Sequence, residues 1–331
     1  MNVKEFPKGF VWGTSTSSYQ IEGAPLAVQW IIHYIKRVSI FSLTLILMFS
    51  SSLFAQPENE ELIKINHQQF DIVTHKMHII PGMWRPMFES EQVAWISPPW
   101  ESQEYVWFDF PEAIWVEGNL AYLGHIDRRF PTLFPTEKSV PWRKLENGIV
   151  YEQVLPNGVS FGGEITRREE NIAELKLWIT NGSENELKDV MLLTCVYLDG
   201  IKEFNEKTNE NKYVHTPDKG WLSFPDTEGM QIVTDGWRVG WLNEGAQVSD
   251  LPVVVVKSKV ERHILALTWF DDTYSFIGNL NHPCVHADPV FNNLKPGESQ
   301  TISGELIFFE GSLEEFEIMF KERYVLAKTT E

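Results

Sequence analysis

The sequence predicts an all-β fold, a large antiparallel β-sandwich of the supersandwich type with a short C-terminal helix. From His67 onward, short apolar runs with alternating side chains are broken by Pro, Gly and Asn. Many short strands between such turns are typical of a sandwich, whereas a parallel sheet would alternate with helices. A helical spacing of apolar residues occurs at Ser312–Tyr324, after a Ser cap and early acidic residues.

The strand candidates follow one another along the chain. They are Tyr105–Phe110, Ala113–Val116, Glu174–Thr180, Asp189–Tyr197, Met230–Thr234, Arg238–Leu242, Pro252–Val256, His263–Thr268 and Thr301–Phe309. Alternation places Leu175, Leu177 and Ile179 on one face of their strand. The polar loop after Thr180 predicts that this strand and Asp189–Tyr197 form an antiparallel hairpin.

The segment Lys36–Gln56 divides the chain. Two basic residues, an apolar run from Val38 to Phe49, and small or polar residues up to Ala55 follow the order of a bacterial secretory signal peptide. We therefore expect a foreign head at 1–35, a signal peptide at 36–55 and a β-sandwich domain at 56–331. The apolar run reaches about 17 residues only with its Ser-rich end, the lower limit for a membrane helix. A secreted or periplasmic protein is expected, with no membrane contact after signal cleavage, and an uncleaved anchor is the alternative.

Composition limits the partners. The 331 residues carry a formal net charge of −18. This charge excludes nucleic acid and anionic membranes, which demand a basic face, and favours neutral substrates such as carbohydrate. The 13 Trp and 21 Phe fit either a densely packed core or surfaces that stack on sugar rings. Cys195 and Cys284, the 2 cysteines, could form one disulfide in an oxidising compartment.

The head carries a family signature. The run FPKGFVWGTSTSSYQIEGAP at Phe6–Pro25, with Trp12, Tyr19, Gln20 and Glu22 in the expected pattern, resembles the N-terminal signature of family 1 glycoside hydrolases, the β-glucosidases. The resemblance implies the first strand of a (β/α)₈ barrel, with Gln20 binding a sugar hydroxyl. It ends there, because neither Thr-x-Asn-Glu-Pro nor Thr-Glu-Asn-Gly, the contexts of the family's two catalytic glutamates, occurs in the chain. We interpret the head as a chimeric remnant.

The body of the chain carries a second resemblance. The stretches around 174–197 and 294–309 resemble the large β-sandwich domains related to galactose mutarotase. That resemblance implies a fold common in carbohydrate-active proteins.

The polar run NLNHPCVHADP, which begins at Asn279, is the first candidate site. It places His282, Cys284, His286 and Asp288 at even spacing, so an extended backbone would project all four to one side. His282, His286 and Asp288 are candidate ligands of a divalent metal ion, the candidate cofactor, and His286 and Asp288 are a candidate acid/base pair. The alternative is a loop whose side chains satisfy buried backbone groups, with Cys284 in the core or bridged to Cys195.

Two other polar runs and several tryptophans are candidates. Glu117–Arg129 predicts catalytic roles for His125, Asp127 and Arg128, and binding of an anionic sugar by Arg129; an ion-pair network is the alternative. Asp199–Glu203 follows a strand end, where residues face a cleft or simply form a turn. Tryptophans in polar or Gly/Pro-rich surroundings could stack on sugars, and core packing is their alternative role. They are Trp84, Trp95, Trp100, Trp221, Trp237 and Trp241.

Together these observations predict an exported carbohydrate-active protein. As an enzyme it would act on a glycosidic linkage by acid/base hydrolysis or elimination, with or without a metal ion. The alternatives are a non-catalytic glycan-binding module, in which tryptophans supply the affinity, and a structural protein of the envelope. The sequence gives no indication of the oligomeric state.

Overall fold

The computed structural model describes residues 76–82, 92–117, 119–123, 140–227, 231–233, 236–240, 249–259, 262–270, 273–279 and 282–330. The head and the signal peptide expected at 1–35 and 36–55 lie outside the described residues.

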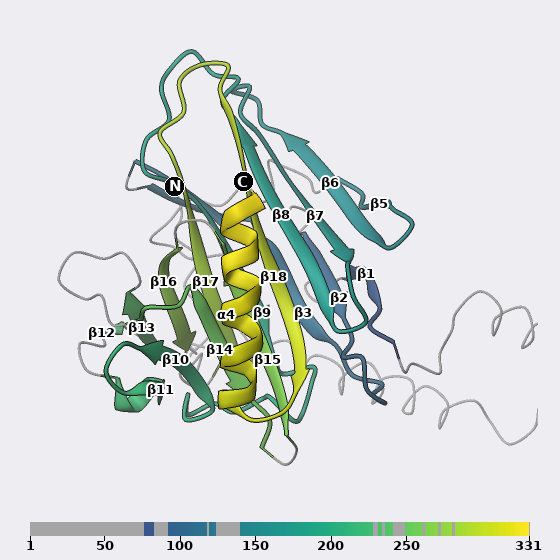
Figure 1. Ribbon diagram of the computed structural model, residues 1–331. Helices are drawn as coiled ribbons and strands as arrows, with labels where there is room; N and C mark the ends of the chain where they lie inside the picture. The colour runs from purple at the N-terminus through teal and green to yellow at the C-terminus, as the bar shows by residue number, and fades with distance from the viewer. Residues whose placement is uncertain are drawn as a thin grey trace, which may run out of the picture. The chain divides into compact units, whose positions relative to one another are not determined.

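Antiparallel pairing builds two nine-stranded sheets (Figure 1). The first sheet has the order β1-β2-β3-β9-β17-β16-β13-β12, with β4 paired to β3. Its strands are β1 (Ile79–Gly82), β2 (Val93–Ile96), β3 (Val106–Val116), β4 (Asn119–Tyr122), β9 (Val190–Tyr197), β12 (Gln231–Val233), β13 (Gly236–Gly240), β16 (Thr273–Asn279) and β17 (Cys284–Phe291).

The second sheet has the order β11-β10-β14-β15-β18-β8-β7-β6-β5. Its strands are β5 (Arg143–Lys144), β6 (Gly148–Val154), β7 (Ser160–Arg167), β8 (Ile172–Thr180), β10 (Lys212–Thr216), β11 (Gly220–Ser223), β14 (Val253–Lys257), β15 (His263–Trp269) and β18 (Ser299–Glu310). A 3₁₀ turn, η1 (Phe224–Asp226), follows β11. The predicted all-β fold is confirmed.

The inner faces of the two sheets enclose one apolar core. The rings of Phe110 in the first sheet and Trp269 in the second stack at a centroid distance of 6.1 Å. The indole N–H of Trp269 also donates to the carbonyl oxygen of Ala287 in β17, at 3.1 Å. Both contacts join strands of different sheets, so the sheets pack face to face as a sandwich.

The second sheet is covered on its outer face by helix α4 (Leu313–Thr330). In β14, Val254 and Val256 belong to the core between the sheets, whereas Val253 and Val255 pack in a second cluster with Phe316 and Phe320 of α4. Valines at the first four positions of β14 therefore suit a strand that is buried on both faces. Figure 1 shows α4 lying along this sheet beside β15 and β18.

The helix begins as the sequence predicts. The Ser312 hydroxyl accepts from the backbone N–H of Glu315 at 3.2 Å, and the Glu315 carboxylate accepts from the backbone N–H of Ser312 at 2.7 Å. This reciprocal pair is a capping box. Within the described ranges, no helix combines the length and the apolar character that crossing a membrane requires.

The hairpin predicted from Glu174–Thr180 and Asp189–Tyr197 is wrong. β8 pairs with β7 and β18 in the second sheet, and β9 pairs with β3 and β17 in the first. The predicted faces are right, since Leu175, Leu177 and Ile179 are buried in the core. The apolar faces of β8 and β9 contribute to the same core from different sheets, so the chain passes from one sheet to the other between them.

Strand β3 runs through the Pro111-Glu112 break that the sequence predicted between two strands. Its pairing with β9 includes Asp109 and resumes at Ala113, with an irregular register between them. Glu112 therefore lies in a section of the strand that regular alternation does not govern.

Candidate functional site

Aromatic residues form a row across the outer face of the first sheet. Antiparallel register sets Trp95 opposite Trp107, Trp107 opposite Tyr197, and Tyr197 opposite Cys284. The neighbouring residues of β2 and β3, Ala94 and Phe108, point into the core. The row therefore faces away from the core.

Neighbouring rings are in contact along this aromatic row, which consists of Trp95, Trp107 and Tyr197. Ring centroids lie 6.5 Å apart for Trp95 and Trp107, and 5.6 Å apart for Trp107 and Tyr197. The indole rings lie over glycines, since a Cβ on Gly82 would stand 2.3 Å from the Trp95 ring and one on Gly200 2.6 Å from Nε1 of Trp107. Both indoles remain partly exposed.

A polar row follows the aromatic row on the same face. Asp109 of β3 is opposite Cys195 of β9, and His286 of β17 is opposite Ile277 of β16. The register on either side, with Val285 opposite Val196 and Val290 opposite Met191, places Cys195 opposite His286. The polar row is buried: Asp109 is 2% exposed, Cys195 1% and His286 7%.

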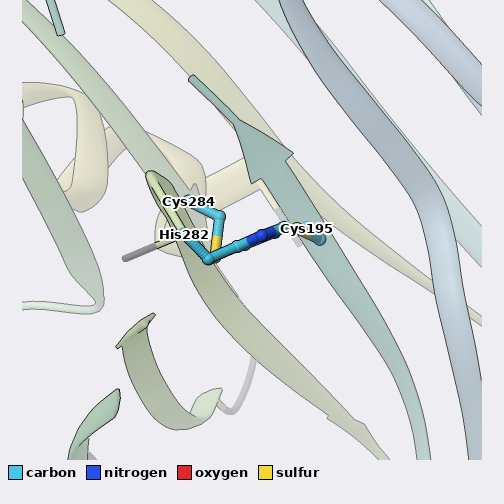
Figure 2. Close-up of side chains that lie close together, drawn as sticks. All are labelled: Cys195, His282 and Cys284. Atoms are coloured by element: carbon cyan, nitrogen blue, oxygen red, sulfur yellow. The ribbon is translucent and has the colours of Figure 1, made fainter. Parts of the chain in front are cut away.

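Three side chains converge where the two rows meet. One ligand atom each of Cys195, His282 and Cys284 lies within 4.8 Å of the other two. Figure 2 shows these side chains meeting from β9, from the residues just before β17, and from β17. The His282 ring also lies 4.6 Å from the Tyr197 ring, which connects it to the aromatic row.

His286 and Glu112 extend this group. Nε2 of His286 is 3.4 Å from Sγ of Cys284, and Nδ1 of His286 is 3.6 Å from a carboxylate oxygen of Glu112. Glu112, Cys195 and His286 also have ligand atoms within 4.8 Å of one another. We call the five residues Glu112, Cys195, His282, Cys284 and His286 the thiol–imidazole cluster.

Charges within the thiol–imidazole cluster are coupled. Burial raises the pKa of Cys284, but a hydrogen bond from Cys195 and the nearby His286 and His282 imidazoles outweigh it and hold that pKa well below its ordinary value. The hydrogen bond to Cys284 and burial raise the pKa of Cys195 well above its ordinary value. Cys195 is therefore a thiol that donates to the Cys284 thiolate.

Both imidazoles respond to that thiolate. Burial lowers the pKa of His286, but Cys284, Glu112 and Asp288 outweigh that effect and raise the pKa to about 10. Burial likewise lowers the pKa of His282, and the Cys284 thiolate reverses the shift and raises it. The shifts of Cys284 and of the two imidazoles therefore all favour their charged forms, a thiolate beside imidazolium groups, in a largely buried cluster.

Strand β17 positions three of the residues of the first candidate run. Val285 and Ala287 point into the core, so Cys284, His286 and Asp288 share the outer face. Asp288 accepts a hydrogen bond from the Ser275 hydroxyl at 2.7 Å. Their catalytic and metal-binding roles stay predictions. The two cysteines are free thiols, so the disulfide that the sequence left open is not formed.

Most of the other predicted site residues lie outside the part of the chain that the structure describes. The described residues do not include His125, Asp127, Arg128, Arg129, Trp84 or Trp241. Trp237 is at a β13 register position opposite Gly278. Trp221 belongs to the second sheet, where its ring lies 5.9 Å from Phe316 of α4. Their proposed roles in substrate binding stay predictions.

The run Asp199–Glu203 follows β9 and has structural partners. The Glu203 carboxylate accepts from the Trp100 indole at 2.9 Å and lies 2.8 Å from Nδ1 of His263. The Trp100 and His263 rings stack at 3.8 Å. Trp100 is therefore tied to this internal network.

Sequence reasoning did not select Glu112, Trp107 or Tyr197, nor Cys195 as more than a disulfide partner. Alternation in YVWFDF could have placed Trp107 and Asp109 on one face. Nothing local to the sequence could have placed β3 beside β9 and β9 beside β17, which is what assembles the cluster.

Comparison with known proteins gives a short match at the N-terminal end. The chain is 74% identical over 27 residues to β-glucosidase A of Thermotoga maritima, a stretch that covers 8% of this chain and 6% of that protein. It is 68% identical over 25 residues to a 1,4-β-D-glucan glucohydrolase of Thermotoga neapolitana, again covering 8% and 6%. The chain thus spans 6% of the length of these relatives. The resemblance to family 1 glycoside hydrolases is confirmed for this short stretch.

No family model matches the chain. Among solved structures, an aldose epimerase homologue from C. elegans has 10% identity and a TM-score of 0.38, covering 71% of this chain and 100% of that one. A protein of Synechocystis sp. PCC 6803 has 6% identity and a TM-score of 0.37, covering 70% and 96%. The fold itself rests on the strand pairing described above.

Proposed function

We propose that this is an exported carbohydrate-active protein that acts on a glycosidic linkage, with its site on the outer face of the first sheet. The observation that carries the proposal is the aromatic row, Trp95, Trp107 and Tyr197, which leads directly to the thiol–imidazole cluster. Export is proposed from the signal-like segment at 36–55 alone.

The aromatic row suits a sugar chain. The apolar C–H faces of pyranose rings stack on indole and phenol rings, and the polar edges of those rings remain available for hydrogen bonds. Successive ring centroids lie 6.5 Å and 5.6 Å apart across three strands; Trp95 and Trp107 are partly exposed, whereas Tyr197 is buried at the end of the row. The net charge of −18 favours a neutral glycan over a strongly anionic one on this surface.

The cluster supplies acid and base groups at the end of that surface. The His286 imidazole lies 3.6 Å from the Glu112 carboxylate, and Asp288 follows on the same face of β17. In hydrolysis, one group would donate a proton to the leaving glycosidic oxygen while the other takes a proton from the attacking water. In elimination, a base would remove the proton next to a uronate carboxylate, and the leaving oxygen would take up a proton.

The names of the two Thermotoga relatives agree with a carbohydrate-active protein, but they do not bear on the sandwich. The Thermotoga proteins are named as a β-glucosidase and a glucan glucohydrolase, and the match to them lies in the head. The sandwich lacks both catalytic contexts of that family. The proposal for the sandwich therefore depends on its own residues.

The test is turnover by the purified full-length chain on a panel of neutral and uronate-containing polysaccharides. New reducing ends without unsaturated products would identify hydrolysis, and ultraviolet absorbance of unsaturated sugars would identify elimination. We expect Glu112→Gln and His286→Ala to reduce turnover about 100-fold or more. Thr301→Ala, an exposed position in the second sheet, is the control and should leave turnover unchanged. Turnover by both cluster variants at the wild-type rate would refute the proposed acid/base role.

The alternative is a non-catalytic glycan-binding module, and the burial of His286 and Asp288 favours it. These side chains are 7% and 2% exposed, which limits direct contact with a polymer. Such a module would bind glycans through the aromatic row without turning any over. Trp107→Ala would then weaken binding, whereas Glu112→Gln would leave it unchanged.

A further inference from the structure

Outside its suggested acid/base role, the cluster has the composition of a metal site. Cys195, His282 and Cys284 bring two sulfurs and one imidazole within 4.8 Å of one another. Cys195 is in β9 and Cys284 is in β17. These two strands are paired, with Tyr197 opposite Cys284, so the backbone holds the two sulfurs in place. His282 is fixed beside them by its ring contact with Tyr197, at 4.6 Å.

The spacing fits tetrahedral coordination. With Zn–S bonds of about 2.3 Å and Zn–N bonds of about 2.1 Å, ligand atoms of a tetrahedral site lie roughly 3.6–3.8 Å apart. The three ligand atoms already lie within 4.8 Å, so closing around an ion requires side-chain shifts of about 1 Å and no movement of the strands.

The ligand types select the metal. Thiolate sulfur and imidazole nitrogen favour zinc, whereas calcium and magnesium require oxygen ligands. The neighbours suit this use, because the Asn279 side-chain amide donates to Cys284 Sγ at 3.3 Å and so orients the sulfur. We propose that Cys195, His282 and Cys284 bind one zinc ion at the outer face of the first sheet.

This ligand set differs from the one that the sequence suggested. His282 is common to both, but the two cysteines replace His286 and Asp288. Asp288 already accepts the hydrogen bond from Ser275. His286, with Nε2 at 3.4 Å from Cys284 Sγ, and Glu112 lie next to the three ligands without belonging to the set. Three protein ligands with an open fourth position are typical of catalytic zinc sites.

The inference depends on ligand geometry and not on glycan turnover, so the two proposals can fail separately. The test uses the full-length chain, reduced, stripped with a chelator and titrated with Zn²⁺ and with Co²⁺. We expect one equivalent to bind, with thiolate-to-cobalt charge-transfer absorption, and zinc to raise the thermal unfolding midpoint of the wild type. Failure to bind one equivalent, or a cobalt spectrum without thiolate bands, would overturn the proposal.

Variants locate the ligands. Cys195→Ser, Cys284→Ser and His282→Ala should each weaken zinc binding more than about 100-fold. His286→Ala should retain one equivalent and the thiolate bands, since His286 is outside the ligand set. Circular dichroism identifies any variant that fails to fold, and for such a variant the effect of zinc on the unfolding midpoint of the wild type decides. A midpoint that is the same with and without zinc would contradict the proposal.

Discussion

Removing Arg323 from α4 should destabilise the protein strongly, because it would leave a buried carboxylate without its main partner. Arg323 donates from Nε and a terminal nitrogen to the two oxygens of Glu305 in β18, at 3.0 and 2.6 Å, and from its other terminal nitrogen to Glu169 at 2.8 Å. The Glu305 side chain is 2% exposed, whereas its remaining cation, Arg168 at 3.8 Å, is 56% exposed. An exposed and more distant cation compensates a buried charge poorly.

The magnitude follows from that burial. Breaking a buried ion pair by removing one partner costs about 3–5 kcal/mol. Because Arg323 is itself 19% exposed and Arg168 remains, we expect Arg323→Ala to lower the free energy of unfolding by about 3 kcal/mol. Most of this cost should disappear in the double variant with Glu305→Gln, because the uncompensated charge is then absent.

Urea unfolding followed by circular dichroism measures all four proteins of this double-mutant cycle. We predict a coupling of about 2 kcal/mol between the two positions. Lys321→Ala is the control, because Lys321 pairs with Glu317 on the exposed side of the same helix and should cost less than about 1 kcal/mol. A loss for Arg323→Ala no larger than that of the control would refute the account of how α4 docks on the second sheet.

Three further predictions test the site and the fold. Trp107→Ala should weaken binding of an oligosaccharide about three- to tenfold by calorimetry, since a ring contact is worth about 0.5–1.5 kcal/mol, whereas Trp178→Ala on the second sheet should not. Ser312→Ala should lower the free energy of unfolding by about 1 kcal/mol through loss of the α4 cap, and an unchanged urea midpoint would refute the capping box. Burial lowers the pKa of Lys212 to about 8, so below pH 8 the folded chain carries the cost of a buried ammonium. As the pH rises from 8 toward the higher pKa of Lys212 in the unfolded chain, only the unfolded chain stays charged. The wild type therefore gains stability over this range of pH. At pH 7, the free energy of unfolding of Lys212→Met, measured with urea, should therefore exceed that of the wild type by about 2 kcal/mol. The difference should be smaller at pH 9, and a difference that does not change with pH would contradict the lowered pKa of Lys212.

The sequence predicted what local patterns encode. Alternation in β8 placed Leu175, Leu177 and Ile179 on the buried face, because a strand has a side-chain period of two. The same period placed Cys284, His286 and Asp288 on one face of β17. The start of α4 followed from Ser312 and Glu315, whose hydrogen bonds close within three residues.

Those local patterns could not predict which strands pair with each other. Alternation says which face of β9 is buried but not which strand lies beside it, so β8 and β9 were predicted to pair although they belong to different sheets. Cys195 and Glu112 reach His286 because β3, β9 and β17 are neighbours in the first sheet, an arrangement set by contacts far apart in the sequence. Glu112 also lies in the irregular part of β3, where the position of a side chain cannot be read from a period of two.

A crystal structure of the full-length chain with a bound oligosaccharide is the most direct test of the proposed site. The account predicts sugar rings stacked on Trp107 and Tyr197, with a glycosidic oxygen near His286. Sugar bound beside Trp221 on the second sheet, with the outer face of the first sheet empty, would contradict it.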